Sequence, residues 1–360
     1  MKAIVWGCGG NGRDFLNRKV MNYKYDILCF VDSNSNLWGS DFEGKYRIVS
    51  PDEMDSFDYE IVIVCVADCD EIISNLEKRG IGKKKVKTYK ELEAELCEII
   101  VKKYDNSFDP EIQSALDVYR EGELSFFGSY HPPYSIFSEV FRDTDGFPYI
   151  MFEDKRMYYP KDFRFQLRDG KEVVADILYE QGKESPHRYI PDGYEMPRKA
   201  TILDAGVCEG NFALRYVEDA SKIYLVEADE RWMNALRMTF KPFRDKVVFC
   251  NKFLSGRNNS KEITIDSLVE GKLDFLKMDI EGAEVYALLG GRKTLESNNT
   301  QCSVCTYHRQ YDEDYVSFIL NSYGYDTSKS QGYVFFSYDE TMVDTLDLRR
   351  GVVYGTKRPI

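Results

Sequence analysis

The sequence predicts an α/β fold with two domains, each built on a parallel β-sheet. Short apolar runs alternate with helical patterns over residues 2–95, and the alternation restarts more strongly at Ala200. Each series also has a glycine-containing turn directly after its first apolar run. Ligands of open parallel sheets bind at the carboxyl ends of the strands, so both turns fall where a binding site is expected.

Length and charge exclude several classes of protein. The 360 residues are enough for two domains with separate apolar cores. A net charge of −13 argues against nucleic acid as a general partner. No apolar stretch approaches the length of a membrane span, and Met1–Trp6 reads as the start of a strand rather than a signal peptide. We therefore expect a cytoplasmic protein without a membrane span; the oligomeric state stays open, a homo-oligomer included.

The cysteine pattern indicates free thiols. Nine cysteines are scattered through expected strands and turns, which is typical of a reducing compartment. Cys302 and Cys305 have the spacing of a zinc or redox pair, but no second pair or paired histidines accompany them, and their segment reads as a buried strand. The sequence therefore assigns no metal site.

The first domain is predicted over residues 1–100 and contains a nucleotide-binding pattern. Gly7–Gly12 matches G-x-G-x-x-G, and Asp32 ends the next strand. Glycines let the backbone approach a pyrophosphate at a helix N-terminus, and a strand-end aspartate can accept hydrogen bonds from ribose. Gly7, Gly9, Gly12 and Asp32 are the predicted contacts. The alternative is a turn that only packs strand against helix. The expected elements are strands at Lys2–Trp6, Ile27–Val31 and Ile61–Val66 and helices at Gly12–Val20 and Asp70–Arg79.

This region resembles the small N-terminal domains of bacterial sugar acyltransferases and related polysaccharide-biosynthesis proteins. The resemblance rests on Gly7–Gly12, Phe30–Asp32 and Ser50–Met54, and it covers about the first quarter of the chain. It implies a nucleotide or nucleotide-sugar ligand for the first domain.

Residues 101–195 are predicted to form a helical linker and an aromatic-rich cap. A helix over Glu91–Lys103 leads out of the first domain, and Ser125–Pro160 is rich in Tyr, Phe, Pro and Gly, which suits short strands and a lid. His187 and Arg188 follow on an expected loop. We predict substrate contacts for both, because ligand contacts are frequent on loops and histidine titrates near neutral pH.

The second α/β series defines a domain over residues 196–360. The expected strands are Thr201–Ala205, Lys222–Val226, Lys246–Asn251 and Leu273–Met278. The expected helices are Asn211–Glu218, Glu230–Phe240, Ala283–Leu289 and Tyr311–Tyr323. Tyr333–Ser337 and Gly351–Tyr354 read as a closing antiparallel pair.

The first turn of this series suits S-adenosylmethionine better than a dinucleotide. It reads Asp204-Ala-Gly206-Val-Cys-Glu-Gly210 and lacks G-x-G-x-x-G. S-adenosylmethionine has no phosphate, so its pocket needs glycines for close backbone approach and carboxylates for its amino group and ribose. The predicted cofactor-binding residues are Asp204, Gly206, Gly210, Glu227 at the end of the second strand, and Asn251 at the end of the third.

With these residues in place, the region from about 180 to 330 resembles the FkbM-type family of S-adenosylmethionine-dependent methyltransferases. Asp204–Gly206, Val226–Glu227, Ile263–Leu268 and above all Lys277–Glu284 carry the resemblance. It implies a class I methyltransferase sheet and methylation of oxygen on sugars or specialised metabolites. The loop Gly206–Gly210 departs from the Gly-Ala-Asn-x-Gly of many relatives.

The predicted reaction centre is Asp279, Glu281 and His308. Asp279 and His308 follow expected strands at their carboxyl ends, where a methyl donor would lie along the sheet, and each type of side chain can act as a base. Glu284 reads as a helix-terminal acid. A divalent cation on Asp279 is compatible with this chemistry, but the sequence shows no ligand set.

These features predict an O-methyltransferase for a sugar hydroxyl in glycan or polysaccharide biosynthesis, acting on a small-molecule or glycan substrate. The first alternative is a non-catalytic nucleotide-binding or nucleotide-sugar-binding scaffold of a glycan-assembly pathway. The second is a nicotinamide-dependent sugar-modifying enzyme that acts through the first domain, although no Tyr-Lys or Cys-His partner for that chemistry is evident.

Overall fold

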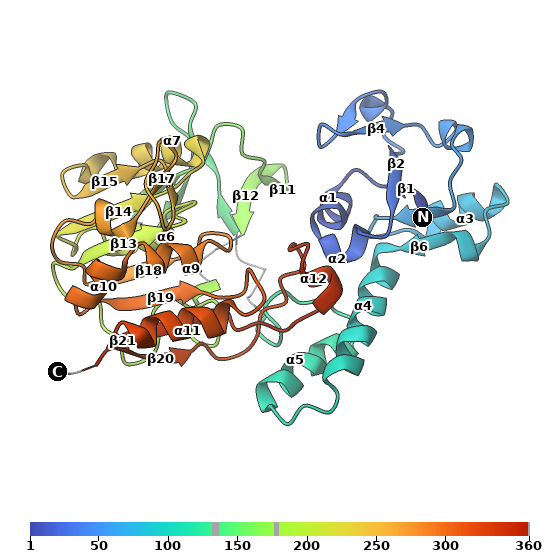
Figure 1. The fold of residues 1–360 in the computed structure, drawn as a ribbon. Helices are drawn as coiled ribbons and strands as arrows, with labels where there is room; N and C mark the ends of the chain where they lie inside the picture. The colour runs from blue at the N-terminus through green and yellow to red at the C-terminus, as the bar shows by residue number, and fades with distance from the viewer. Residues whose placement is uncertain (132–136, 176–179, 359–360) are drawn as a thin grey trace. The chain divides into compact units, whose positions relative to one another are not determined.

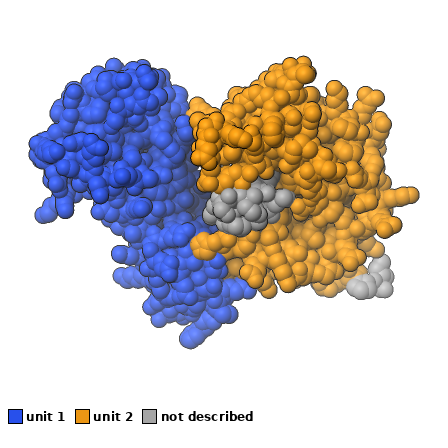
Figure 2. Space-filling view, turned by 180° about the vertical axis from the view of Figure 1, so that it is seen from behind, with its two compact units in different colours: residues 1–129, 335–348 blue, residues 130–334, 349–360 orange. Residues whose placement is uncertain are grey.

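The computed structural model describes residues 1–131, 137–175 and 180–358. It divides into two compact units (Figure 2). Unit 1 comprises Met1–Ser129 and Phe335–Leu348, and unit 2 comprises Tyr130–Val334 and Arg349–Ile360. Each unit contains a sheet of mainly parallel strands, so the predicted α/β class is confirmed (Figure 1). The predicted domain boundaries at residues 100 and 195 stay predictions.

Unit 1 has a six-stranded sheet in the order β3-β4-β2-β1-β5-β6, parallel except for β3 at the edge. Its central strands are continuous apolar runs that are buried on both faces, as a parallel sheet covered by helices requires. The strands are β1 (Lys2–Trp6), β2 (Asp26–Val31), β3 (Asp41–Phe42), β4 (Tyr46–Val49), β5 (Ile61–Val64) and β6 (Val86–Thr88). The helices are α1 (Gly10–Asn17), α2 (Lys19–Asn22), α3 (Asp70–Lys78), α4 (Tyr89–Tyr104), α5 (Pro110–Arg120) and α12 (Met342–Thr345).

The two helices after this sheet have clear start signals. Thr88 and Glu91 form a capping box at the start of α4. Asp109 caps α5, which has Pro110 at its first position. Both α4 and α5 belong to unit 1.

Unit 2 has a seven-stranded sheet in the order β15-β14-β13-β18-β19-β21-β20, in which only β21 runs antiparallel to its neighbours. The strands are β13 (Thr201–Ala205), β14 (Lys222–Val226), β15 (Val247–Cys250), β18 (Phe275–Met278), β19 (Gln301–Cys305), β20 (Tyr325–Lys329) and β21 (Val352–Lys357). The helices are α6 (Asn211–Tyr216), α7 (Glu230–Thr239), α8 (Ile265–Leu268), α9 (Glu284–Leu289), α10 (Arg292–Ser297) and α11 (Asp312–Ser322). A short pair, β16 (Phe253–Leu254) and β17 (Glu262–Ile263), lies outside the sheet.

One predicted strand of the closing pair is wrong. Residues 333–337 contribute only an isolated bridge from Val334 to Arg349, and Phe335 donates its backbone N–H to Phe126 in unit 1. The partner of β21 is β20 instead. The apolar run at 333–337 misled the prediction because its rings pack in an aromatic cluster, whereas β20 is a polar edge strand without an apolar run.

The aromatic-rich segment forms two three-stranded antiparallel sheets in unit 2, β10-β9-β8 and β11-β12-β7. The backbone N–H of Tyr158 donates to the hydroxyl of Thr239 at 2.9 Å and ties β10 to α7. The strands are β7 (Phe137–Glu139), β8 (Phe141–Arg142), β9 (Pro148–Phe152), β10 (Lys155–Tyr158), β11 (Gln166–Arg168) and β12 (Lys171–Ala175). Part of the predicted cap, residues 132–136, lies outside the described residues.

None of the helices within the described ranges is both long and apolar enough to cross a membrane.

Candidate active site

A cavity of about 570 Å³ opens at the carboxyl ends of β13, β14 and β18 in unit 2. The chain runs from β13 to β14 on one side and from β18 to β19 on the other, so the order of connection reverses between the neighbours β13 and β18. Such a switch point is where open α/β sheets bind ligands. Five of the predicted residues line the cavity: Gly206, Glu227, Asp279, Glu281 and His187.

Gly206 brings the turn after β13 into contact with the backbone after β18. Its φ is +70°, and a β-carbon built on it would lie 1.5 Å from the carbonyl oxygen of Asp279. Only glycine fits there. Gly210 is needed for a different reason, because it precedes α6 with φ +86°, and a β-carbon would lie 2.7 Å from Leu236. Gly210 therefore lets α6 pack against α7 and does not line the cavity.

Glu227 ties the loops at the end of β14 to the glycine turn. Its Oε2 accepts a hydrogen bond from the backbone N–H of Cys208 at 3.1 Å, and its Oε1 accepts one from Asp229 at 2.8 Å. Carboxylate oxygens accept more than one hydrogen bond, so Glu227 can still accept from a ribose diol. Asn251 is exposed and does not line the cavity; its side-chain amide donates to the carbonyls of Glu227 and Ala228. Asn251 thus supports the backbone of two residues that line the cavity.

Asp204 and Lys277 form a buried ion pair beneath the glycine turn. The Asp204 side chain is 1% exposed, and its Oδ1 lies 3.2 Å from Nζ of Lys277. Lys277 also donates to the carbonyl of Gly206 at 2.5 Å. Burial lowers the pKa of Lys277, but the charges of Asp204 and Asp279 outweigh it and raise the pKa to about 12. Asp204 therefore acts on the cavity through Lys277, without lining it.

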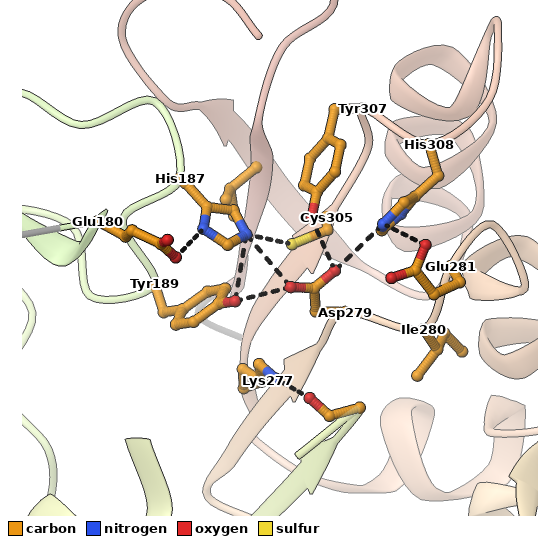
Figure 3. A network of polar contacts seen from close by, with 12 residues as sticks. Glu180, His187, Tyr189, Lys277, Asp279, Ile280, Glu281, Cys305, Tyr307 and His308 are labelled. Atoms are coloured by element: carbon orange, nitrogen blue, oxygen red, sulfur yellow. Dashed lines mark hydrogen bonds and ion pairs between the residues drawn. The ribbon is translucent and has the colours of Figure 1, made fainter. Parts of the chain in front are cut away.

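Asp279 lies at the centre of a network of polar contacts (Figure 3). Its Oδ2 accepts the hydroxyl hydrogen of Tyr189 at 2.8 Å and lies 3.2 Å from Nε2 of His187. Its Oδ1 accepts the hydroxyl hydrogen of Tyr307 at 3.1 Å and lies 3.4 Å from Nε2 of His308.

The same contacts make Asp279 a weak base. Burial by itself would raise the pKa of the carboxyl, but the hydrogen bond and the charge of His187, with the charges of His308 and Lys277, hold that pKa well below its ordinary value. The predicted base role is therefore not favoured for Asp279, which is better suited to orienting the groups around it.

His308 is buried behind Asp279 and held by Glu284. It is 2% exposed and does not line the cavity, and its Nδ1 lies 3.0 Å from Oε1 of Glu284, which is fully buried at the start of α9. Burial lowers the pKa of His308, but Glu284 and the charges of Asp279 and Glu281 outweigh it and raise the pKa to about 9. An imidazole that is charged at neutral pH is a poor proton acceptor, so the structure does not favour His308 as the base.

Glu281, the third predicted catalytic residue, lies at the rim. Its side chain is 83% exposed, and its Oε2 lies 3.6 Å from Nε2 of His308. It has φ +58°, an uncommon backbone conformation for glutamate, in the turn between β18 and α9. Glu281 thus lines the cavity with a side chain that is mostly exposed, unlike that of Asp279.

The two predicted substrate residues differ in whether they line the cavity. His187 lines the cavity with a side chain only 8% exposed, and its Nδ1 lies 3.8 Å from Oε2 of Glu180. Arg188 does not line the cavity; its guanidinium donates to Asp192 at 2.8 Å.

The sequence prediction missed four residues that build this site: Lys277, Tyr189, Tyr307 and Glu180. Lys277 had a usable signal, because it interrupts the apolar strand β18. Tyr189 and Tyr307 each lie close to a histidine in the sequence. Their convergence on Asp279 depends on three separate segments and has no local signal.

Two groups of side chains within the described ranges have donor atoms close enough for a metal ion. They are His187, Asp279 and Cys305, and Asp279, Glu284 and His308. The hydroxyls of Tyr189 and Tyr307 already donate to the two oxygens of Asp279, which both groups share. We assign no metal here. All nine cysteines, Cys302 and Cys305 included, are free thiols.

Unit 1 has a second cavity, of about 400 Å³, at the turn after β1. Gly7, Gly9 and Asp32 line it. Oδ2 of Asp32 accepts a hydrogen bond from Cys8 N–H at 2.9 Å, which is the arrangement that Glu227 makes with Cys208 in unit 2. Gly12 does not line the cavity: a β-carbon there would lie 2.2 Å from the carbonyl oxygen of Gly7, so Gly12 is needed for packing.

Two family models match parts of the chain, one of them in unit 2. Residues 251–335 match the model described as methyltransferase FkbM domain. Part of unit 2 is therefore similar to the FkbM methyltransferase domain. This match supports an S-adenosylmethionine-dependent methyltransferase, as predicted. Residues 1–87 match another model, described as C2185-like, N-terminal, and the predicted resemblance to sugar acyltransferases is not shown by it.

The solved structures to which this chain is similar are distant in sequence. Methyltransferase FkbM from Methylobacillus flagellatus is 13% identical with a TM-score of 0.49, over 98% of this chain and 89% of that chain. Magnesium protoporphyrin IX methyltransferase from Synechocystis, with bound SAM, is 12% identical with a TM-score of 0.32, over 46% and 72% of the two chains. A putative methyltransferase from Streptococcus mutans in complex with SAH is 13% identical with a TM-score of 0.33, over 45% and 91%. No curated protein matches the sequence.

Proposed function

We propose that the protein transfers a methyl group from S-adenosylmethionine to a hydroxyl group of a sugar in glycan or polysaccharide biosynthesis. The observation that carries the proposal is the cavity of unit 2, which joins the Gly206 turn and Glu227 to the Asp279 network at the switch point of the sheet. The match of residues 251–335 to the FkbM methyltransferase domain supports it.

The residues of the cavity fit S-adenosylmethionine. Gly206 leaves room that a β-carbon would fill, and Glu227 lies at the end of β14, where a ribose diol can donate to it. The lining contains six acidic side chains and two lysines, an excess that favours a cationic ligand. Gly206 and Glu227 would hold the cofactor directly, whereas Asp204, Gly210 and Asn251 would support them. When bound, S-adenosylmethionine supplies a methyl group on a positively charged sulfur.

The wall around Asp279 suits a polyhydroxyl acceptor. Tyr189 and Tyr307 line it and donate to Asp279, and Trp232 of α7 lines another part of the same cavity. Aromatic faces and fixed hydrogen-bonding groups together are suited to the apolar faces and hydroxyls of a sugar. Holding the acceptor oxygen beside the donor replaces a bimolecular encounter, so positioning can supply much of the acceleration.

The test is incubation of the intact protein with methyl-labelled S-adenosylmethionine and a panel of nucleotide sugars and glycans. We expect label in an O-methyl product, and we expect the Asp279→Asn variant to lose it. Binding of S-adenosylmethionine without transfer to any acceptor would instead favour the non-catalytic scaffold.

A second candidate activity, nucleotide or nucleotide-sugar binding by unit 1, is supported by two glycines that the fold does not need. Neither Gly9 nor Gly10 has a positive φ, and a β-carbon on either would meet nothing within 4 Å. Both line the cavity of unit 1. Their missing side chains leave open space over the turn, which a phosphate approaching the backbone would use.

We therefore expect Gly9→Val to weaken nucleotide binding at least tenfold while changing the free energy of unfolding by no more than about 0.5 kcal/mol. Calorimetry with a uridine diphosphate sugar and fluorescence titration with NADH measure the two ligand types. Gly82→Val is the matched control, because Gly82 also has open space around it but does not line this cavity. Equal binding by both variants would contradict the proposal, and NADH binding alone would favour the nicotinamide-dependent alternative.

A further inference from the structure

Two neighbouring helices of unit 2 expose large apolar side chains. Helices α9 and α11 pack against each other, and their buried residues, such as Leu288 and Leu320, belong to the core of unit 2 (Figure 1). Five further apolar residues of this pair are between 54% and 74% exposed, and together they are called the apolar face here: Tyr286, Leu289, Tyr311, Tyr315 and Phe318.

The exposed positions of α11 form one stripe that contains a single charge. From Tyr311, which precedes the helix, to the last helical residue, the exposed residues are Tyr311, Asp314, Tyr315, Phe318, Asn321 and Ser322. Steps of three and four residues follow one face of an α-helix. Of these six residues only Asp314 is charged. The exposed residues of α9 are Tyr286 and Leu289, so α9 adds no charge.

Another helix of the same unit shows the ordinary pattern. The exposed residues of α7 are all polar: Glu230, Arg231, Asn234 and Arg237. A surface helix normally turns a polar face to water and an apolar stripe to the core. Helix α11 instead has large apolar residues on both faces. Aromatic enrichment together with depletion of charge is typical of the centre of a protein interface.

The size of the apolar face fits a second copy of this chain. At roughly 200 Å² for one aromatic side chain, the exposed parts of the four rings alone amount to about 500 Å² in each chain. Two such faces would therefore bury about 1,000 Å² in total, and the residues around the rings extend the contact toward the range of about 1,200–2,000 Å² of specific interfaces.

The charges also favour a second copy. The chain has a net charge of −13, so two copies approach most easily where charges are few. A two-fold axis that crosses α11 uses the same patch twice and makes the two helices antiparallel. Asp314 lies in the first turn of α11, so the two copies of Asp314 are then at opposite ends of the contact, and the opposed helix dipoles attract each other.

A membrane surface fits the apolar face less well. Anionic lipid headgroups are bound by clusters of lysine and arginine. The exposed residues of α9 and of the α11 stripe include neither type.

We propose that the protein forms a homodimer through the apolar face, with a two-fold axis that crosses α11. The rings of Tyr315 and Phe318 lie at the centre of this interface, because both are flanked by further exposed residues of the stripe. The inference goes beyond the proposed methyl transfer and needs neither a cofactor nor an acceptor.

Sedimentation velocity of the intact protein from about 1 to 100 µM tests the proposal. We expect twice the mass of one chain at the upper end of this range. Phe318→Asp should weaken the association by at least about 100-fold, because each copy would bury an unpaired carboxylate in the contact. Leu167→Asp is the matched control, because Leu167 has the same exposure of 74%, also lies in unit 2 and is outside the apolar face. It should keep the dimer.

A single-chain mass for the unaltered protein at about 100 µM would overturn the proposal. A dimer that persists in Phe318→Asp, or one that is lost equally in Leu167→Asp, would overturn the assignment of the interface. If circular dichroism shows that Phe318→Asp fails to fold, Tyr315→Lys on the same stripe takes its place. A monomer that sediments with phosphatidylcholine vesicles, and no longer does so as Phe318→Asp, would show that the face meets a bilayer instead of a second copy.

Discussion

Gly206→Ala is expected to abolish S-adenosylmethionine binding and to destabilise unit 2. The added β-carbon would lie 1.5 Å from the carbonyl oxygen of Asp279, and φ at this position is +70°. Overpacking and backbone strain each cost about 1–3 kcal/mol. The atom in conflict is backbone, so relief requires moving β13 and β18 apart at the point where they border the cavity. Calorimetry measures the loss of binding, and urea unfolding measures the loss of stability.

Gly271→Ala separates the two causes. Gly271 also lies in unit 2 and has φ +79°, but a β-carbon there would meet nothing within 4 Å. It should therefore show the cost of the positive φ alone, about 1–2 kcal/mol, with cofactor binding intact. If Gly206→Ala behaves like Gly271→Ala, the close approach of Gly206 to Asp279 is not what shapes the cavity.

Lys277→Met is expected to destabilise the protein by about 3–5 kcal/mol, because it leaves the buried carboxylate of Asp204 without its cation. The variant also loses the hydrogen bond from Lys277 to the carbonyl of Gly206, so the glycine turn loses a support and cofactor affinity should fall. Urea unfolding monitored by circular dichroism measures the first effect.

The double variant Lys277→Met with Asp204→Leu checks this explanation. It removes both charges and should recover much of the stability, because an apolar pair of similar volume needs no desolvation of ions. Arg292→Met, which breaks the exposed pair with Glu296, should cost no more than about 1 kcal/mol. A Lys277→Met variant as stable as Arg292→Met would contradict the importance of the buried pair.

The sequence predicted the parts of the fold that have local signals. The strands β1, β5, β13, β14 and β18 are short, mainly apolar runs, and their length and the turn residues that follow β1, β13, β14 and β18 identify them. The strand β20 was missed because an edge strand of polar residues has no such pattern. The run at 333–337 was misread because aromatic residues favour strands but also pack as clusters.

The site was predicted only in part, because long-range contacts have no local signal in the sequence. The predictions placed Gly206, Glu227 and Asp279 from their positions at strand ends, and these three line the cavity. The burial of individual side chains has no local signal in the sequence. The sequence therefore cannot show that His308 lies behind Asp279 and contacts Glu284. It also cannot show that His187, from a loop distant in the sequence, contacts the same aspartate. The contacts of the two histidines therefore depend on the tertiary structure.

Calorimetric titration of the intact protein with S-adenosylmethionine is the most direct test of the cavity in unit 2 as the methyl-donor site. We predict binding with one site per chain, lost in Gly206→Ala and retained in Gly271→Ala. Heat of binding absent from the unaltered protein, or unchanged in Gly206→Ala, would contradict the assignment of this cavity to the methyl donor.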